Sequence, residues 1–189
     1  AGNPDSPLST RPQMDNEEWS DFCKKISEVG KYLEDQGMPL AYHHHMGTVI
    51  ETQKDTERLL ESTSEHVKLI LDTGHMLFAS GNSIETYNNF KDRIIHIHCK
   101  DIRKDILDKS LEKDLSFRQA FLEGAFTVPG DGYIDYKPFF ELLTKNDYSG
   151  WLVVEAEQDP IKANPLEYAK IGFNYLTKTC EETNLKIIK

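Results

Sequence analysis

The chain has few cysteines and no long run of apolar residues or of like charges. Its three cysteines, Cys23, Cys99 and Cys180, are an odd number without a CxxC pair, which argues against a disulfide scaffold and favours a reducing cytoplasm. No apolar segment approaches the roughly 18 residues that a membrane-spanning helix requires. The net charge of −10, without long blocks of one sign, argues against nucleic acids and anionic membranes as main partners.

Nucleotide-binding motifs are missing as well, since neither a GxGxxG fingerprint nor a P-loop follows any expected strand. What is present is the composition of a globular protein, with 38% hydrophobic and 29% charged residues in a chain of 189. This length suits one domain or a piece of a larger one. The first dozen residues, AGNPDSPLSTRP, are typical of a loop, so we expect the chain to begin inside a longer domain.

Apolar periodicity predicts an alternation of strands and helices. Strands are expected at residues 39–45, 67–72, 93–99 and 151–156. Helices are expected at residues 15–36, 52–62, 84–91, 104–124 (one or two helices), 135–143 and 165–182. This order is typical of parallel βα units with right-handed crossovers. The apolar run in VKLILD further predicts a sheet that is covered on both faces.

Every expected strand ends in side chains that can bind a metal ion. In chain order these are His43, His44 and His45, then Asp72 and His75, then His96 and His98, and finally Glu155 and Glu157. Ligands of parallel α/β folds sit at the carboxyl ends of the strands, so these groups should meet. A single strand-end histidine is more often a core residue than a ligand, but four such strands predict a site for a divalent metal.

Asp72 is the most informative of these residues, because it directly follows Ile70 and Leu71. A buried carboxylate is costly unless something compensates its charge. One interpretation is that Asp72 caps the next turn. The other, which the remaining strand ends favour, is that a metal cation compensates it.

Alternation along each strand limits which side chains share a face. Side chains two positions apart point the same way, so His43 and His45 should lie together and His44 should point toward the helices. The same rule pairs His96 with His98, and Glu155 with Glu157. Periodicity does not choose between the members of a pair.

Five segments carry a family resemblance: YHHHMGT, LDTGHMLFASG, HIHCKDIR, FTVPGDGYIDY and GWLVVEAEQDP. Together they resemble the inosose dehydratases of myo-inositol catabolism, a branch of the xylose-isomerase-like TIM barrels, over residues 7–175. The resemblance implies a (β/α)8 barrel of which residues 1–189 supply the last four βα units, with residues 1–14 as a loop or linker. A half-barrel leaves unpaired strand edges, so we expect the missing N-terminal half, or self-association, to complete it.

The resemblance also implies one divalent metal, manganese or cobalt first, with zinc or magnesium as alternatives. Asp72, His98 and Glu155 match the family's ligands. At the position of the first ligand, relatives have a glutamate but this sequence has His43. The first ligand is either His43 or the neighbouring His45. The implied catalytic residues are His75, Lys100 and Glu155, and the implied substrate-binding residues are His45, His75, Lys100 and Arg103. For Lys100 a plain salt bridge with Asp101 is the alternative.

The implied reaction converts a cyclic polyol ketone, 2-keto-myo-inositol (scyllo-inosose), to a trihydroxycyclohexane-1,2-dione. A metal on the carbonyl side would stabilise the enolate, a base would remove the α proton, and an acid would protonate the departing hydroxyl. His75 and Lys100 are candidates for these proton transfers, in either order, and Glu155 is an alternative base. The isolated fragment is expected to be inactive.

Three rival functions remain at this point. A sugar isomerase or epimerase would use the same enolate but return the proton. Phosphodiester hydrolysis would need several metals and a basic groove, which the net charge of −10 disfavours. The third is a scaffold without catalytic activity. The possible metal ligands at the strand ends argue against this function for the full-length protein.

Overall fold

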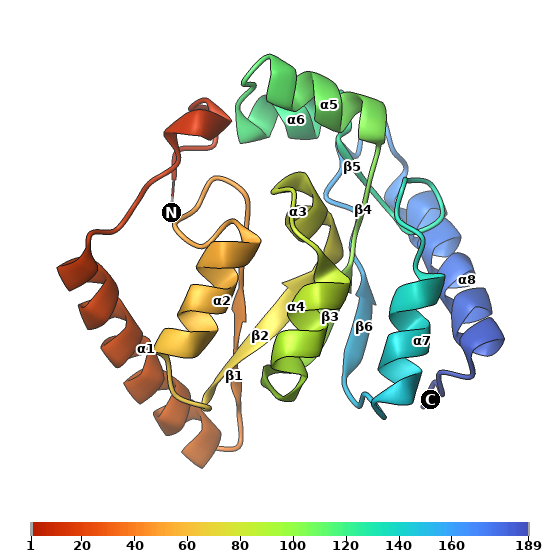
Figure 1. Cartoon of the computed structure of the whole chain (residues 1–189). Helices are drawn as coiled ribbons and strands as arrows, with labels where there is room; N and C mark the ends of the chain where they lie inside the picture. Colours follow the sequence, from red (N-terminus) through yellow and green to blue (C-terminus); the bar gives the residue numbers. More distant parts are fainter. Residues whose placement is uncertain (1, 189) are drawn as a thin grey trace.

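The centre of the structure, a computed structural model that describes residues 2–188, is a four-stranded parallel sheet (Figure 1). Its strands lie in the order β1 (Leu40–His43), β2 (Val67–Asp72), β3 (Ile94–Cys99) and β6 (Trp151–Val154). All three neighbouring pairs are parallel. The four predicted strands and the α/β class are confirmed, although the first and last strands end two residues earlier than expected.

The predicted helices are confirmed too, and their ends follow from local chemistry. Helix α1 (Asn16–Asp35) begins at the expected capping box of Asp15 and Glu18. It ends just before Gly37, whose φ of +79° favours glycine. The other predicted helices are α2 (Gln53–Ser62), α4 (Ser83–Phe90), α5 (Lys104–Glu112), α6 (Phe117–Glu123), α7 (Lys137–Lys145) and α8 (Pro165–Thr183).

Three short elements were not predicted. Helix α3 (Thr73–Phe78) follows β2 directly, and its six residues are too few to show a helical period. Strands β4 (Asp101–Ile102) and β5 (Phe126–Thr127) form a small antiparallel pair beyond the end of β3. Two single 3-10 turns, Leu8–Thr10 and Lys91–Arg93, complete the described elements.

Helices cover one face of the sheet, with α2, α4 and α7 in front of the strands in Figure 1. Burial therefore alternates along β2, where Val67, Leu69 and Leu71 are fully buried but Lys68 and Ile70 are only half-buried. The expected covering of both faces is not found within residues 2–188. We call the half-exposed side the inner face.

The inner face carries polar residues at the carboxyl ends of its strands. Trp151, at the start of β6, is 72% exposed there, while the next residue, Leu152, packs with the helices. The edge strands β1 and β6 each pair with a single neighbour in the described part of the chain. None of the helices in residues 2–188 has the length and apolar character needed to cross a membrane.

Candidate active site

Four side chains, each at or just after the end of a different strand, converge at the carboxyl end of the sheet. We call them the first ligand group: His43, Asp72, His98 and Glu155, each of which offers a nitrogen or oxygen within 4.8 Å of the others. The register explains the convergence, because Asp72 lies opposite His98 and His43 lies opposite Ile70. Asp72 Oδ2 is 3.2 Å from His43 Nε2 and 3.4 Å from His98 Nδ1.

This donor set fits a divalent metal ion. Two imidazoles and two carboxylates are a combination that manganese, cobalt and zinc accept. His98 Nδ1 and Glu155 Oε2 are 2.9 Å apart, yet neither atom has an aligned hydrogen-bond partner among residues 2–188. Buried polar atoms normally have hydrogen-bond partners, whereas the His98 nitrogen has no aligned partner here and the Glu155 oxygen has only the Lys100 ammonium, 3.0 Å away, so both atoms can still bind a metal ion. Between the two candidates for the first ligand, His43 is the one that lies in this group.

Asp72 does two things with its two oxygens. Oδ1 accepts the backbone N–H of His75 at 2.8 Å and so caps α3, as the simpler interpretation of the sequence predicted. Oδ2 faces His43, His98 and the Lys100 ammonium, which is 3.3 Å away. Burial alone would raise the pKa of Asp72, but its interactions with His75 and Lys100, followed by those with His43 and His98, lower it well below its usual value.

His44 is fully buried and belongs to neither ligand group, as alternation predicted for the middle histidine. Its Nε2 accepts the backbone N–H of Asp72 at 3.2 Å, which places its ring proton on Nδ1. Burial lowers the pKa of His44 to about 3, so the ring stays neutral. His44 therefore fixes the backbone that carries Asp72.

A second group of possible ligands lies beside the first. His45, His75 and Glu157 again offer atoms within 4.8 Å of one another, and we call them the second ligand group. Glu157 Oε1 is 3.5 Å from His45 Nε2, and Glu157 Oε2 is 3.2 Å from His75 Nε2. The His45 and His75 rings lie against each other with centroids 3.9 Å apart.

Lys100 lies between the two groups and is fully buried. Its Nζ is 3.0 Å from Glu155 Oε2 and 3.0 Å from His75 Nε2, and it also bonds to Glu157 Oε2. Burial lowers the pKa of Lys100, but the carboxylates of Asp72, Glu157 and Glu155 more than offset this and raise it above its usual value. The amine is therefore a charged ammonium.

The alternative pairing of Lys100 with Asp101 was wrong. Asp101 Oδ1 instead accepts the backbone N–H groups of Ile102 at 2.7 Å and Ile134 at 2.9 Å. Consecutive residues of an extended segment point to opposite sides, which is why the two side chains separate. Burial raises the pKa of the Asp101 carboxyl to about 6.

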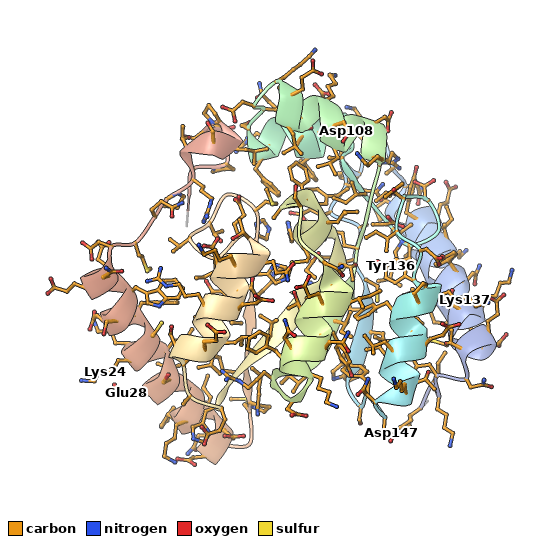
Figure 2. All side chains as sticks on the ribbon, in the orientation of Figure 1. Lys24, Glu28, Asp108, Tyr136, Lys137 and Asp147 are labelled. Atoms are coloured by element: carbon orange, nitrogen blue, oxygen red, sulfur yellow. The ribbon has the colours of Figure 1, made fainter. Side chains whose placement is uncertain are left out.

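A buried hydroxyl network holds the backbone of Lys100. Thr73 Oγ1 lies 2.7 Å from the Lys100 carbonyl and 2.7 Å from the Tyr136 hydroxyl, which itself donates to that carbonyl at 2.9 Å. Figure 2 shows Tyr136 at the start of α7, on the side toward the sheet. The loop before α7 thus helps to position the lysine.

Exposure separates the side chains that a ligand can touch from those behind them. Asp72, His75 and Lys100 have no exposed side-chain surface. Those that reach the surface are Glu155 (31%), His45 (29%), His43 (26%), Glu157 (20%) and His98 (18%). A small molecule at the inner face would meet Glu157 and His45 before it met His75 or Lys100.

Arg103, expected on the substrate side, makes its contacts elsewhere. Its guanidinium donates to the Gly124 carbonyl at 2.8 Å and pairs with Asp131 at 2.6 Å, which ties the β4–β5 pair to the loop that follows it. No contact joins Arg103 to either ligand group within the described residues. Its role toward a substrate stays a prediction.

Sequence reasoning did not select Glu157. Glu155 and Glu157 were expected to point together, yet they join different ligand groups, although both reach Lys100. Strand β6 ends at Val154, and Glu157 has a φ of +40°, so strand alternation does not extend to it. The only signal was the presence of a carboxylate shortly after a strand.

Comparison with known proteins identifies the family. The sequence model described as xylose isomerase-like TIM barrel matches residues 2–179. The chain belongs to this family. Solved structures of xylose isomerase-like and related barrels have the same fold. One is the probable 3-DHS dehydratase AsbF of Bacillus anthracis, which has a TM-score of 0.68 and 17% identity. The match covers 94% of this chain and 61% of that one. The IolI protein with a zinc atom gives a TM-score of 0.56 at 21% identity, over 89% of this chain and 54% of that one.

Within the xylose isomerase-like family, the chain is similar to several curated proteins. It is 49% identical over 168 residues to the inosose dehydratase of Mesomycoplasma hyopneumoniae, covering 88% of this chain and 56% of that protein. It is 46% identical to the inosose dehydratase of Clostridium tetani (93% and 59% covered) and 44% identical to the rhizopine catabolism protein MocC of Rhizobium meliloti (96% and 56%). The expected resemblance to inosose dehydratases is confirmed, and the chain spans little more than half the length of these relatives.

Proposed function

We propose that the protein is a metal-dependent dehydratase, a carbon–oxygen lyase, that converts 2-keto-myo-inositol to a trihydroxycyclohexane-1,2-dione in inositol catabolism. The observation that carries the proposal is the pair of ligand groups joined by Lys100, because it combines metal-binding donors with adjacent proton-carrying groups. The similarity of 43–49% to proteins named inosose dehydratase supports the substrate.

In this proposal the first ligand group, His43, Asp72, His98 and Glu155, holds one manganese or cobalt ion. The position of His43, which lies with Asp72, His98 and Glu155 whereas His45 lies in the second ligand group, supports this set over one that uses His45. When bound, such an ion polarises a ketone oxygen and stabilises the negative charge that develops on it.

The exposed members of the second ligand group are suited to the proton transfers. We assign removal of the α proton to Glu157, which the Lys100 ammonium keeps as an acceptor-only carboxylate. His45, 3.5 Å from Glu157, then protonates the departing hydroxyl to give water. Return of the proton from Glu157 to His45 resets both groups, so the net change is loss of water from the substrate.

His75 and Lys100, the catalytic residues expected from the sequence, act behind these two in the proposal. Both are fully buried and both contact Glu157, so they set its charge and orientation. Glu155 is kept as a metal ligand that can also accept a proton. The substrate itself would contact His45 and the first ligand group at the inner face.

We further propose that residues 1–189 form the last four βα units of the barrel, and that the other half, or a second copy, completes it. Helices α1 and α8 are the outermost helices in Figure 1, and both expose large apolar residues. Tyr32 of α1 is 64% exposed and Phe173 of α8 is 63% exposed. Exposed apolar surface beside a single-neighbour strand supports a partner element on each side. The three free cysteines fit a cytoplasmic location.

The test is a product assay on the whole protein, loaded with manganese or cobalt and supplied with inosose. The dehydratase proposal requires formation of a dione, detected by its ultraviolet absorbance and by mass loss of one water. A sugar isomerase or epimerase, the alternative function, would incorporate solvent deuterium into a product of unchanged composition. That result without any dione would replace the proposal by the alternative.

A further inference from the structure

We propose that the Lys100 ammonium takes the place of a second metal ion in the second ligand group, so that the two groups together accommodate one divalent cation and one ammonium. Removal of this ammonium should turn His45, His75 and Glu157 into a new metal site. The inference rests on the proposed function only in taking the first ligand group as the place of the resident metal.

The second ligand group has the make-up of a metal site but its donor atoms are already engaged. His75 Nε2, which would have to face an ion, is 3.0 Å from Lys100 Nζ instead. Glu157 Oε2 bonds to the same Nζ. An ammonium donates three hydrogen bonds, and here it directs them at atoms that would otherwise be ligands.

The three carboxylates around Lys100 balance the charge of one metal ion and the lysine, before the proton that His45 carries in the proposed reaction is counted. Three carboxylates surround Lys100 Nζ, namely Asp72, Glu155 and Glu157. Their three negative charges equal those of one divalent ion plus one ammonium. A second divalent ion beside an intact Lys100 would leave an excess of positive charge in a buried site, where charges are weakly screened and repulsion is strong.

The lysine is also held so that it cannot leave. Its side chain is fully buried, and its stem crosses Gly74 at a distance that leaves no room for a β-carbon there. The Thr73 and Tyr136 hydroxyls fix its backbone from behind. A cation that the fold positions this firmly works as a permanent part of the site, as a bound ion would.

The experiment counts metal ions per chain in the whole protein. Wild type and the Lys100→Met variant are loaded with cobalt, freed of weakly bound metal by dialysis and analysed by elemental analysis. Methionine keeps most of the stem's volume and removes the charge. We expect one ion per chain in wild type and a second in Lys100→Met, with added visible absorbance from cobalt bound by imidazole and carboxylate.

Three controls locate the added ion. Lys100→Met combined with Glu157→Gln should lose it, and Lys100→Arg, which retains a cation, should not gain it. Lys104→Met makes the same substitution at an exposed lysine that pairs with Asp108, outside both groups, and should bind like wild type. Circular dichroism verifies that each variant is folded.

The possible outcomes separate this inference from the proposed function. Equal metal content in wild type and Lys100→Met overturns the inference, whether that content is one ion or none. A gain from none to one in the variant supports the inference while removing the metal from the proposed function. If Lys100→Met does not fold, electron paramagnetic resonance of wild type at saturating manganese decides, because a spin-coupled manganese pair would overturn the inference and isolated ions would support it.

Discussion

A β-carbon at position 74 would lie 2.7 Å from Cγ of Lys100, closer than real β-carbons come to other atoms. The absence of a side chain at Gly74 is therefore what lets the lysine stem cross α3 on its way to the carboxylates. Gly74→Ala should lower the free energy of unfolding by about 1–3 kcal/mol, because it overpacks this crossing. Urea denaturation of the whole protein measures the loss. The penalty should shrink in a Lys100→Gly background, which removes the Lys100 β-carbon at 2.9 Å as well as the rest of the stem, and an equal penalty there would mean that Lys100 is not the obstacle.

Asp72→Asn should sharply reduce metal content while leaving the cap of α3 in place, because the remaining oxygen still accepts the His75 N–H. Mutation of a residue that only hydrogen-bonds to a metal ligand typically lowers metal affinity about 10- to 100-fold, and loss of the ligand Asp72 should lower it at least as much. Elemental analysis after dialysis gives the occupancy. Asp135→Asn is the matched control, since Asp135 also accepts a backbone N–H near a helix start, that of Lys137, but lies outside both ligand groups. Unchanged occupancy in Asp72→Asn would remove Asp72 from the site.

Asp101 should make a contribution to stability that is lost as the pH rises from about 4 to about 6. Its pKa is raised by burial from 3.8 to about 6, so the folded state holds a proton that the unfolded state has already released in this range. The loss amounts to at most about 3 kcal/mol, since one pKa unit is worth about 1.4 kcal/mol. Asp101→Asn should flatten this part of the stability profile, measured by urea denaturation at several pH values.

Asp114 provides the control of opposite sign. Hydrogen bonds from the Ser9 hydroxyl and amide lower the pKa of Asp114 from 3.8, so its contribution to stability is present above about pH 4 and is lost as the pH falls further. Asp114→Asn should therefore leave the Asp101 contribution between pH 4 and pH 6 unchanged and flatten the stability profile below about pH 4. A profile that Asp101→Asn leaves unchanged would show that this carboxyl does not govern it.

Tyr136→Phe should lower the free energy of unfolding by about 1 kcal/mol, because it removes a buried hydroxyl that bonds to Thr73 and to the Lys100 carbonyl. Tyr148→Phe removes a hydroxyl whose contact with the Trp151 carbonyl is exposed, and should cost less. Thermal unfolding of the two variants compares them. Equal losses would contradict a positioning role for the Tyr136 hydroxyl.

Residues 1–189 alone should self-associate and show no turnover of inosose. The exposed apolar residues of α1 and α8 and the inward-facing Trp151 favour contact with another chain over contact with water. Light scattering and an inosose assay on one sample test both points. Tyr32→Lys and Phe173→Lys should weaken association, whereas Lys24→Ala, on the outward side of α1 in Figure 2, should not. A stable monomer with the turnover of the whole protein would refute the half-barrel proposal.

Much of the fold was predictable because each βα unit carries its own local signals. The capping box at Asp15 and the apolar strand before Asp72 are examples, and both were located correctly. The residues of the first ligand group could be predicted from the sequence for the same reason, since each lies at or just after a strand end. Which histidine of the triplet joins them depends on strand register, and only the structure, which brings His43 and not His45 to Asp72, distinguishes the two.

The second ligand group was harder to predict because its geometry depends on loops. Glu157 reaches Lys100 through a backbone turn with positive φ, which no periodic pattern indicates. The burial of Lys100 depends on Gly74 and Tyr136, which lie 26 and 36 residues away from it in sequence. Long-range packing of this kind leaves only weak traces in the local sequence.

Lys100 is synthesised before two of the carboxylates that surround it in the folded protein. Glu157 follows Lys100 by 57 residues, and ribosomes add about 5–20 residues per second, so the glutamate emerges roughly 3–11 seconds later. Until Glu155 and Glu157 emerge, Asp72 is the only carboxylate available to the lysine from the described site, and β3 has no β6 beside it. For several seconds the nascent chain therefore carries a lysine without two of its carboxylate partners and a strand with an unpaired edge. A chaperone that binds the nascent chain would be needed most during this interval.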